Sequence, residues 1–122
     1  SPWQPEFYNW AFNLPRNGQE LESKWSAIPD DIDILITHGP AYGFLDRITG
    51  GWENLGCEKL VGAIKGKKPK IHVCGHIHSG YGHIFDGDTH FINASVLDER
   101  YYLTNKPITV DWDPVTNELV FI

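Results

Sequence analysis

The chain has 122 residues, the length of one small domain, and it contains no methionine. A composition of 41% hydrophobic and 13% aromatic residues excludes an intrinsically disordered chain, and no apolar run is long enough for a membrane span. The net charge of −6 repels polyanions, which argues against nonspecific nucleic-acid binding.

The amino-terminal third predicts irregular chain followed by a helix. Residues 1–16 crowd aromatic side chains between prolines without helical or strand periodicity. Asn17 and Glu20 have the spacing of a capping box, which predicts a helix beginning at Asn17 and ending before Pro29. The apolar face of this helix comprises Leu21, Trp25 and Ile28.

The middle of the chain predicts a strand, a loop, a helix and a second strand. Residues 32–37 are almost wholly apolar and β-branched, which predicts a strand buried on both faces. Residues 39–54, rich in glycine and proline, predict a loop, and 54–66 predict a helix. The apolar stripe of that helix comprises Cys57, Leu60, Val61 and Ile64. Residues 70–75 predict the second strand.

The carboxyl-terminal third predicts antiparallel β-structure. Residues 82–85 and 90–94 flank an Asp-Gly-Asp-Thr turn, which is a strong hairpin signal. Residues 107–112 and 118–122 flank the turn at 113–117 and predict a second hairpin. The fold class is therefore α/β, with two helices and mixed, then antiparallel, strands in a single domain over 1–122.

Three of the six histidines come directly after predicted strands. His38 follows the strand 32–37, and His76 and His78 follow the strand 70–75. The carboxyl ends of parallel strands are where ligands bind in open α/β sheets, so these strands nominate one site. Neutral imidazole is the commonest nitrogen ligand for Zn, Mn and Fe ions, and the glycines around the pair allow each ring to be aimed separately.

At these residues the sequence resembles the calcineurin-like metallophosphoesterases, and within them the metallophosphoesterase-domain-containing branch. The matching segments are SPWQP (1–5), WAFNLPR (10–16), THGP (37–40), GHIHSGYG (75–82), NAS (93–95) and NKPI (105–108). Their order and spacing agree with that branch over nearly the whole chain. The resemblance covers only the carboxyl-terminal half of the family domain.

The resemblance implies the carboxyl-terminal half of a four-layer α/β/β/α sandwich and a phosphoesterase, most often a phosphodiesterase. In the complete family domain two divalent ions (Mn, Fe or Zn) bind a small-molecule phosphoester and activate water for in-line attack on phosphorus. By motif matching, His38 and His76 correspond to ligands of one metal and His78 to a ligand of the other. Tyr81, beside these ligands, is the candidate substrate-binding residue, and no catalytic residue is assigned.

The family's upstream motifs, Asp-x-His, Gly-Asp and Gly-Asn-His-Asp/Glu, are not found in position. The string Asp88-Thr89-His90 fits the first of them but lies in a predicted hairpin turn, so we interpret it as a coincidence. Without a bridging carboxylate, three neutral imidazoles cannot offset the charge of two divalent ions. We therefore expect at most one metal ion on this chain, and little or no activity of the chain alone. We also expect the chain to be trimmed or to come from inside a longer reading frame.

Two alternatives for individual residues stay open. Every second residue from 72 to 78 is a histidine or cysteine (His72, Cys74, His76 and His78), which is compatible with a mononuclear zinc site that uses Cys74. A small core residue is the more common role of cysteine. Tyr42 is a second aromatic residue near the ligands that could contact a substrate or pack on the loop. We expect His72, His83 and His90 to be ordinary strand or turn residues.

Half of a domain leaves apolar strand edges and faces without their usual cover, so we expect self-association into a homo-oligomer. The alternative function is accordingly a non-catalytic oligomeric remnant of a metallophosphoesterase that keeps the histidines without turnover. Two cysteines without framework spacing fit a reduced, cytoplasmic protein.

Overall fold

The computed structural model describes all of residues 1–122. The elements in chain order are β1 (Gln4–Pro5), β2 (Asn13–Leu14), α1 (Gln19–Ser26), β3 (Ile34–Ile36), α2 (Glu58–Lys67), β4 (Ile71–Cys74), the 3₁₀ helix η1 (His78–Gly80), β5 (Gly82–Phe85), β6 (His90–Asn93), β7 (Val110–Trp112) and β8 (Leu119–Phe121). None of the helices is long and apolar enough to cross a membrane. The fold is α/β, with mixed and antiparallel strand pairs, as predicted.

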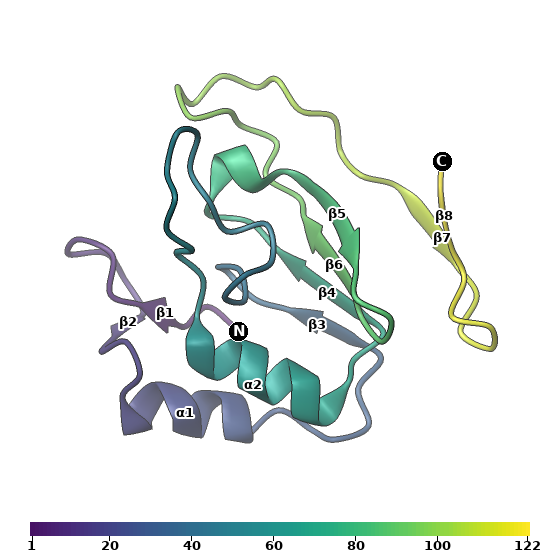
Figure 1. The fold of residues 1–122 in the computed structure, drawn as a ribbon, viewed down its shortest axis with the longest axis horizontal. Coiled ribbons are helices and arrows are strands. Elements are labelled where there is room, and N and C mark those ends of the chain that lie inside the picture. The colour runs from purple at the N-terminus through teal and green to yellow at the C-terminus, as the bar shows by residue number, and fades with distance from the viewer.

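A four-stranded sheet with the order β3-β4-β6-β5 forms the centre of the molecule (Figure 1). β3, β4 and β6 run parallel, with Ile36 paired to Val73 and Val73 paired to Ile92. β5 closes the other edge antiparallel to β6, through the predicted turn at 86–89. The first carboxyl-terminal hairpin is therefore confirmed, and its second strand also joins the central sheet in parallel.

The two helices lie side by side along the sheet (Figure 1) and form the hydrophobic core with it. The buried core cluster comprises Leu14, Leu21, Trp25, Leu35, Ala41, Cys57, Leu60, Ile64 and Phe91. Phe44, from the loop after β3, stacks on Phe91 with ring centroids 3.8 Å apart. The apolar residues predicted for each helix face are thus the ones packed in this core. Burial of the apolar stripe supplies most of the stability of a helix in a folded protein.

The predicted start of the first helix is wrong by two residues, and its capping box is absent. α1 begins at Gln19 with Gly18 as its N-cap, and no side chain caps it. Asn17 instead has φ of 61°, in the left-handed region that asparagine tolerates, and so belongs to the preceding turn. α2 begins four residues later than predicted because Cys57 is its N-cap, with its Sγ accepting a hydrogen bond from Leu60 N.

The prediction that the strand 32–37 is buried on both faces is wrong. Only Leu35 of β3 is buried, whereas Ile34 and Ile36 are 49% and 63% exposed. The reason is position: β3 is an edge strand, and the helices cover only the face to which Leu35 points. The exposed apolar strand agrees with the expectation for a partial domain.

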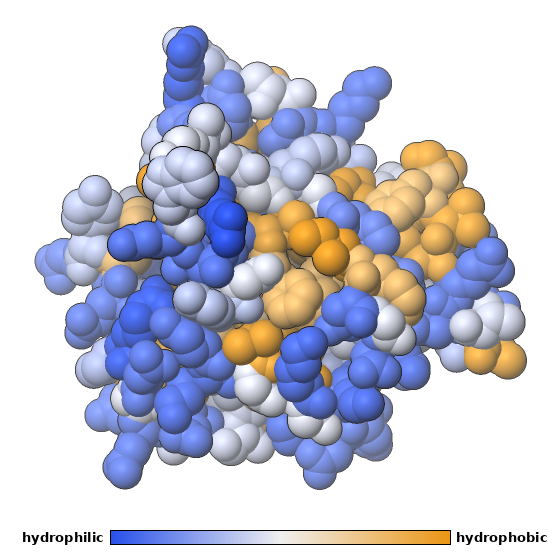
Figure 2. Space-filling view, in the orientation of Figure 1, coloured by the Kyte–Doolittle hydropathy of each residue, from blue (hydrophilic) through white to orange (hydrophobic).

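The second carboxyl-terminal hairpin is confirmed, although its strands are shorter than predicted. β7 and β8 pair antiparallel with Trp112 opposite Leu119 and project to one side of the sheet (Figure 1). The hairpin contacts the sheet through His90, whose Nε2 donates to the carbonyl oxygen of Asn117 at 3.1 Å. Apolar side chains gather at the centre of this view and toward the β7–β8 side (Figure 2).

His72 is almost fully buried on β4, with its ring against Phe91. Burial lowers the pKa of His72 to about 4, and the positive amino terminus adds to the decrease. The ring is therefore neutral in the folded protein throughout the range from pH 5 to 8.

Asn93, at the end of β6, is fully buried and has all its polar atoms paired. Its Nδ2 donates to the carbonyl oxygens of Ile77 (2.8 Å) and Leu45 (3.1 Å), and its Oδ1 accepts from Ser95 N and Oγ. A Cβ at Gly80 would collide with the Leu45 carbonyl and lie 2.7 Å from Asn93 Nδ2, so glycine is required there. Asn93 thus holds the loop after β4 against the loop after β3.

The burial of neutral His72 predicts a protein that is less stable in acid. Because the folded pKa is below the unfolded value near 6.5, the unfolded chain binds more protons, and stability is lost as pH falls from 6.5 toward 4. Urea unfolding should show a loss of about 2 kcal/mol attributable to this residue between pH 7 and pH 4.5. His72→Gln should flatten that part of the profile, and an unchanged slope would contradict the assignment.

Substitution of Asn93 should be costly. Asn93→Ala leaves the Leu45 carbonyl without the Asn93 donor and the Ser95 N–H without its acceptor, and it should lower the free energy of unfolding by about 3 kcal/mol. Asn105→Ala is the matched control, because Asn105 Nδ2 makes a single bond to the Ser95 carbonyl and is only half-buried. Its loss should be about 1 kcal/mol or less in the same urea titration. Equal losses of unfolding free energy for the two variants would show that the Asn93 hydrogen bonds contribute no more than the single Asn105 bond.

Candidate metal centre

The structure brings His38 and His76 together at the carboxyl ends of β3 and β4. His38 Nε2 lies 3.2 Å from His76 Nδ1, within hydrogen-bond distance. The cause is the parallel register, which ends the two strands side by side. The two strand-terminal histidines thus lie side by side, and their role as ligands of one metal stays a prediction.

The backbone of His38 is held from both sides. Its N–H donates to the Ser1 carbonyl at 2.9 Å, and its own carbonyl accepts from Gly75 N at 3.0 Å. The bond to Gly75 joins the loop after β3 to the loop after β4 directly. The positions of the two histidines are consequently coupled through the backbone as well as through their rings.

His76 has an uncommon backbone conformation and an aromatic surround. Its φ of 68° is in the left-handed region, which costs a residue other than glycine about 1 kcal/mol. Phe7 meets its ring edge-on at a centroid distance of 4.6 Å, and Trp10 lies 6.0 Å away. Strain of this kind persists where the surroundings fix the residue, and it concentrates at functional sites.

Both rings of the pair favour the neutral form. Burial lowers the pKa of His76 to about 4, and the nearby His38 and His78 contribute further. Desolvation also lowers the pKa of His38. A neutral imidazole has a free lone pair at neutral pH, which is the form that binds a metal ion.

His78 belongs to the same loop but makes a separate contact. It is the first residue of η1, and its Nδ1 donates to the Asp98 carbonyl at 2.8 Å, since a carbonyl only accepts. Tyr101 packs edge-on against the ring at 5.2 Å. This bond leaves Nε2 of His78 as the lone-pair nitrogen, the arrangement typical of a metal-ligating histidine held by an outer partner.

The residues present fit part of a metal centre. Two nitrogen ligands of one tetrahedral Zn²⁺ lie about 3.3 Å apart, which matches the 3.2 Å between His38 Nε2 and His76 Nδ1. No group of three or more His, Cys, Asp and Glu side chains is arranged to hold an ion, so His78 is not gathered with the pair. No carboxylate joins the two neutral rings to offset the charge of a bound ion.

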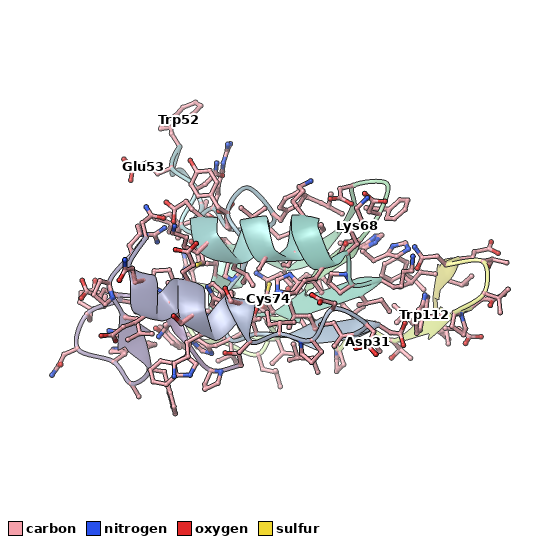
Figure 3. All side chains as sticks on the ribbon, turned by 90° about the horizontal axis from the view of Figure 1, so that it is seen from below. Asp31, Trp52, Glu53, Lys68, Cys74 and Trp112 are labelled. Atoms are coloured by element: carbon pink, nitrogen blue, oxygen red, sulfur yellow. The ribbon has the colours of Figure 1, made fainter.

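The alternative zinc site at Cys74 has no support. Cys74 is buried in the middle of the molecule (Figure 3), and burial, with Asp46 nearby, raises the pKa of its thiol to about 12. No group of three His, Cys, Asp or Glu side chains, Cys74 included, is arranged to hold an ion. Cys74 is therefore a core residue.

The two candidate substrate-contacting tyrosines do not line the histidine pair. Tyr81 follows η1, and its hydroxyl donates to the Lys106 carbonyl at 2.8 Å. Tyr42 lies in the loop after β3, on the surface that also holds Trp52, which projects into solvent (Figure 3). The role of Tyr81 in substrate binding stays a prediction.

Two cavities flank the histidine pair. One, of about 130 Å³, lies beside His76 and is lined in addition by Gln4, Glu6, Arg16 and Pro40 among others. The second, of about 270 Å³, lies beside His38 and is lined by the amino-terminal segment. The segment 1–16 therefore shapes the space around the candidate centre.

Sequence reasoning missed three contributors to this site. Phe7 and Trp10 pack on His76, and Asp98 holds His78 through its main-chain carbonyl. The aromatic density of residues 1–16 was a signal for the first two, although periodicity gave no direction. A contact through a carbonyl oxygen has no side-chain signature, so nothing in the sequence marked Asp98.

Comparisons with known proteins agree with the sequence motifs. The sequence matches no protein-family model. It is 51% identical over 112 residues to "Metallophosphoesterase domain-containing protein 1" of Homo sapiens, covering 91% of this chain and 34% of that protein. It is 46% identical over 112 residues to a UPF0046 protein of Caenorhabditis elegans, covering 91% of this chain and 28% of that protein. The chain thus spans about a third of the length of the curated relatives it matches.

A solved structure shares the fold, with a TM-score of 0.58 at 19% identity over 99% of this chain and 45% of the other. At that identity the likeness concerns the fold alone. The sequence identity to the human and nematode proteins is far higher and extends over nearly all of this chain. The chain therefore matches the metallophosphoesterase-domain-containing proteins over nearly all of its own length and corresponds to a carboxyl-terminal part of their domain.

Proposed function

We propose that the chain is the histidine-bearing part of a metal-dependent phosphoesterase that hydrolyses phosphodiesters of small molecules at a binuclear centre. The observation that supports this most directly is the pairing of His38 and His76 at 3.2 Å, at the carboxyl ends of two adjacent parallel strands. The similarity to metallophosphoesterase-domain-containing proteins points to the same chemistry.

His38 and His76 are the residues that would hold one ion, and His78 would serve the other. A divalent metal supplies charge neutralisation for a phosphoryl group and acidifies water, which explains how a chain with a net charge of −6 could act on an anionic substrate. The protein's own part is to keep the rings neutral, to fix the His78 tautomer through Asp98 and to wall the site with Phe7 and Trp10.

In this proposal the two-metal centre needs carboxylates that these residues do not gather. Two divalent ions close together repel strongly, and a bridging aspartate both joins them and reduces that repulsion. We propose that the complete four-layer sandwich supplies it and that this chain alone binds one ion and turns over little or no substrate. A reducing, cytoplasmic setting belongs to the same proposal and is supported by two free, buried cysteines.

Zinc titration tests the proposed ligands. Isothermal titration calorimetry at pH 7.5 should give one Zn²⁺ per chain, and His38→Ala or His76→Ala should weaken binding at least tenfold. His83→Ala is the matched control, because His83 Nε2 and His90 Nδ1 form another histidine pair at 3.0 Å on the same sheet. If only His83→Ala weakened zinc binding, the metal site would be the His83–His90 pair and not the His38–His76 pair.

Activity on bis(p-nitrophenyl) phosphate with Mn²⁺ tests the rest of the proposal. The chain should show little or no turnover, because only one ion is held. Two tightly bound ions by metal analysis, together with robust Mn²⁺-dependent turnover, would overturn the expected inactivity.

The exposed apolar face of β3 favours a second candidate, a non-catalytic oligomeric module. Ile34 and Ile36 present apolar side chains to solvent from an edge strand, and exposed apolar surface of this kind marks contacts between chains. Sedimentation velocity at micromolar concentration should then show a dimer or larger species, which Ile36→Lys should dissociate. Val115→Lys, at a 90% exposed position in the β7–β8 turn, should leave it intact. A stable monomer would count against this candidate.

A further inference from the structure

We propose that Thr37 and His72 form a buried relay that positions His38, so that both are positioning residues of the candidate metal centre. The relay runs from the core strand β4 to the loop after β3. This inference rests on the proposed function for its consequence in metal binding, whereas its geometry stands on the contacts alone.

The direction of each hydrogen bond follows from the groups involved. Thr37 Oγ1 donates to the Gly39 carbonyl at 2.7 Å, because a carbonyl only accepts. A hydroxyl has a single proton, so the 2.8 Å contact between Thr37 Oγ1 and His72 Nε2 requires the proton to come from His72. His72 is consequently the neutral Nε2–H tautomer.

The relay acts on the two residues that bracket His38. Thr37 precedes it and Gly39 follows it, so a bond from one to the other closes a tight turn with His38 at its tip. The main-chain bonds of His38 to Ser1 and Gly75 hold its backbone from outside, and the relay holds it from the core. His38 itself is exposed, and its ring direction therefore depends on this turn.

Stability alone does not account for a histidine at position 72. The residue lies on β4 and is buried in the core, and its Nδ1 has no hydrogen-bond partner. A buried polar atom without a partner costs about 1–3 kcal/mol, which an aliphatic residue of this strand would avoid. The one favourable polar contact of the ring is the bond to Thr37, and violations of core packing rules of this kind gather at functional sites.

The chain offers a matched control for the threonine. Thr89 is also buried, and its Oγ1 donates to the Pro69 carbonyl at 2.6 Å. It lies just before β6, at the opposite end of the sheet from His38. Thr89→Val and Thr37→Val thus remove the same kind of bond, and only the second touches the candidate centre.

The first measurement needs no metal. Long-range ¹⁵N–¹H correlation spectra of the imidazoles, recorded at pH 8, should show His72 as the Nε2–H tautomer in the unsubstituted chain. Thr37→Val should shift the ring nitrogen resonances of His38 and His76, Thr37→Ser should restore them, and Thr89→Val should leave them unchanged. An Nδ1–H tautomer of His72 would overturn the relay without any variant, even if Thr37→Val failed to fold.

The second measurement is zinc affinity by calorimetry with Zn²⁺ alone. Loss of a group bonded directly to a metal-ligating ring typically weakens binding by 10- to 100-fold. Thr37 bonds to Gly39 and His72 and acts on His38 only through the turn, so Thr37→Val should raise the dissociation constant by about tenfold, the lower end of that range. Thr37→Ser and Thr89→Val should stay within about twofold of the unsubstituted chain. Equal effects of Thr37→Val and Thr89→Val on the spectra or the affinity would overturn the inference. A chain that binds no zinc would defeat the proposed function, and the imidazole spectra would still decide the relay.

Discussion

The parallel pairing of β3 with β4 is the constraint on which the candidate centre depends. Ile36 pairs with Val73, and each strand ends within a few residues of a histidine. A shift of the register by one residue would turn Leu35 out of the core and direct the chain leading to His38 elsewhere. Burial of Leu35 against the helices therefore fixes the register, and the register fixes the distance between His38 and His76.

Around that pairing, buried polar side chains connect the strand ends to the loops. Thr37 and His72 link β4 to the turn at His38, and Asn93 links the end of β6 to the carbonyl of Ile77, between His76 and His78. Thr37 and Asn93 replace water that the backbone carbonyls of the loops would otherwise need. The loops are held in this way although they contain little regular structure.

A binuclear metal site needs neutral histidine ligands and also carboxylates that compensate the charge of the ions. Burial keeps His76 neutral and available as a ligand, which the protein achieves with apolar neighbours such as Phe7. Charge compensation for a second divalent ion needs carboxylates instead, and no carboxylate joins the histidine pair in an arrangement that could hold an ion. Asp86 pairs with Lys65, and Asp46 accepts from the main-chain N–H groups of Gly43 and Gly56. A net negative charge is therefore no substitute for a carboxylate in the correct place.

The sequence by itself determined the two helices, the strands that follow them, the two hairpin turns and the motif residues His38, His76 and His78, because periodicity, turn chemistry and motif spacing are properties of neighbouring residues. It did not indicate the short strands β1 and β2. Only the tertiary structure decided that β3 is an edge strand and that His72 reaches Thr37. It also decided that His78 bonds to the Asp98 carbonyl apart from the paired rings. The physical reason is that these outcomes depend on contacts between residues far apart in the chain, often through main-chain carbonyls, which every residue has and no side-chain pattern distinguishes.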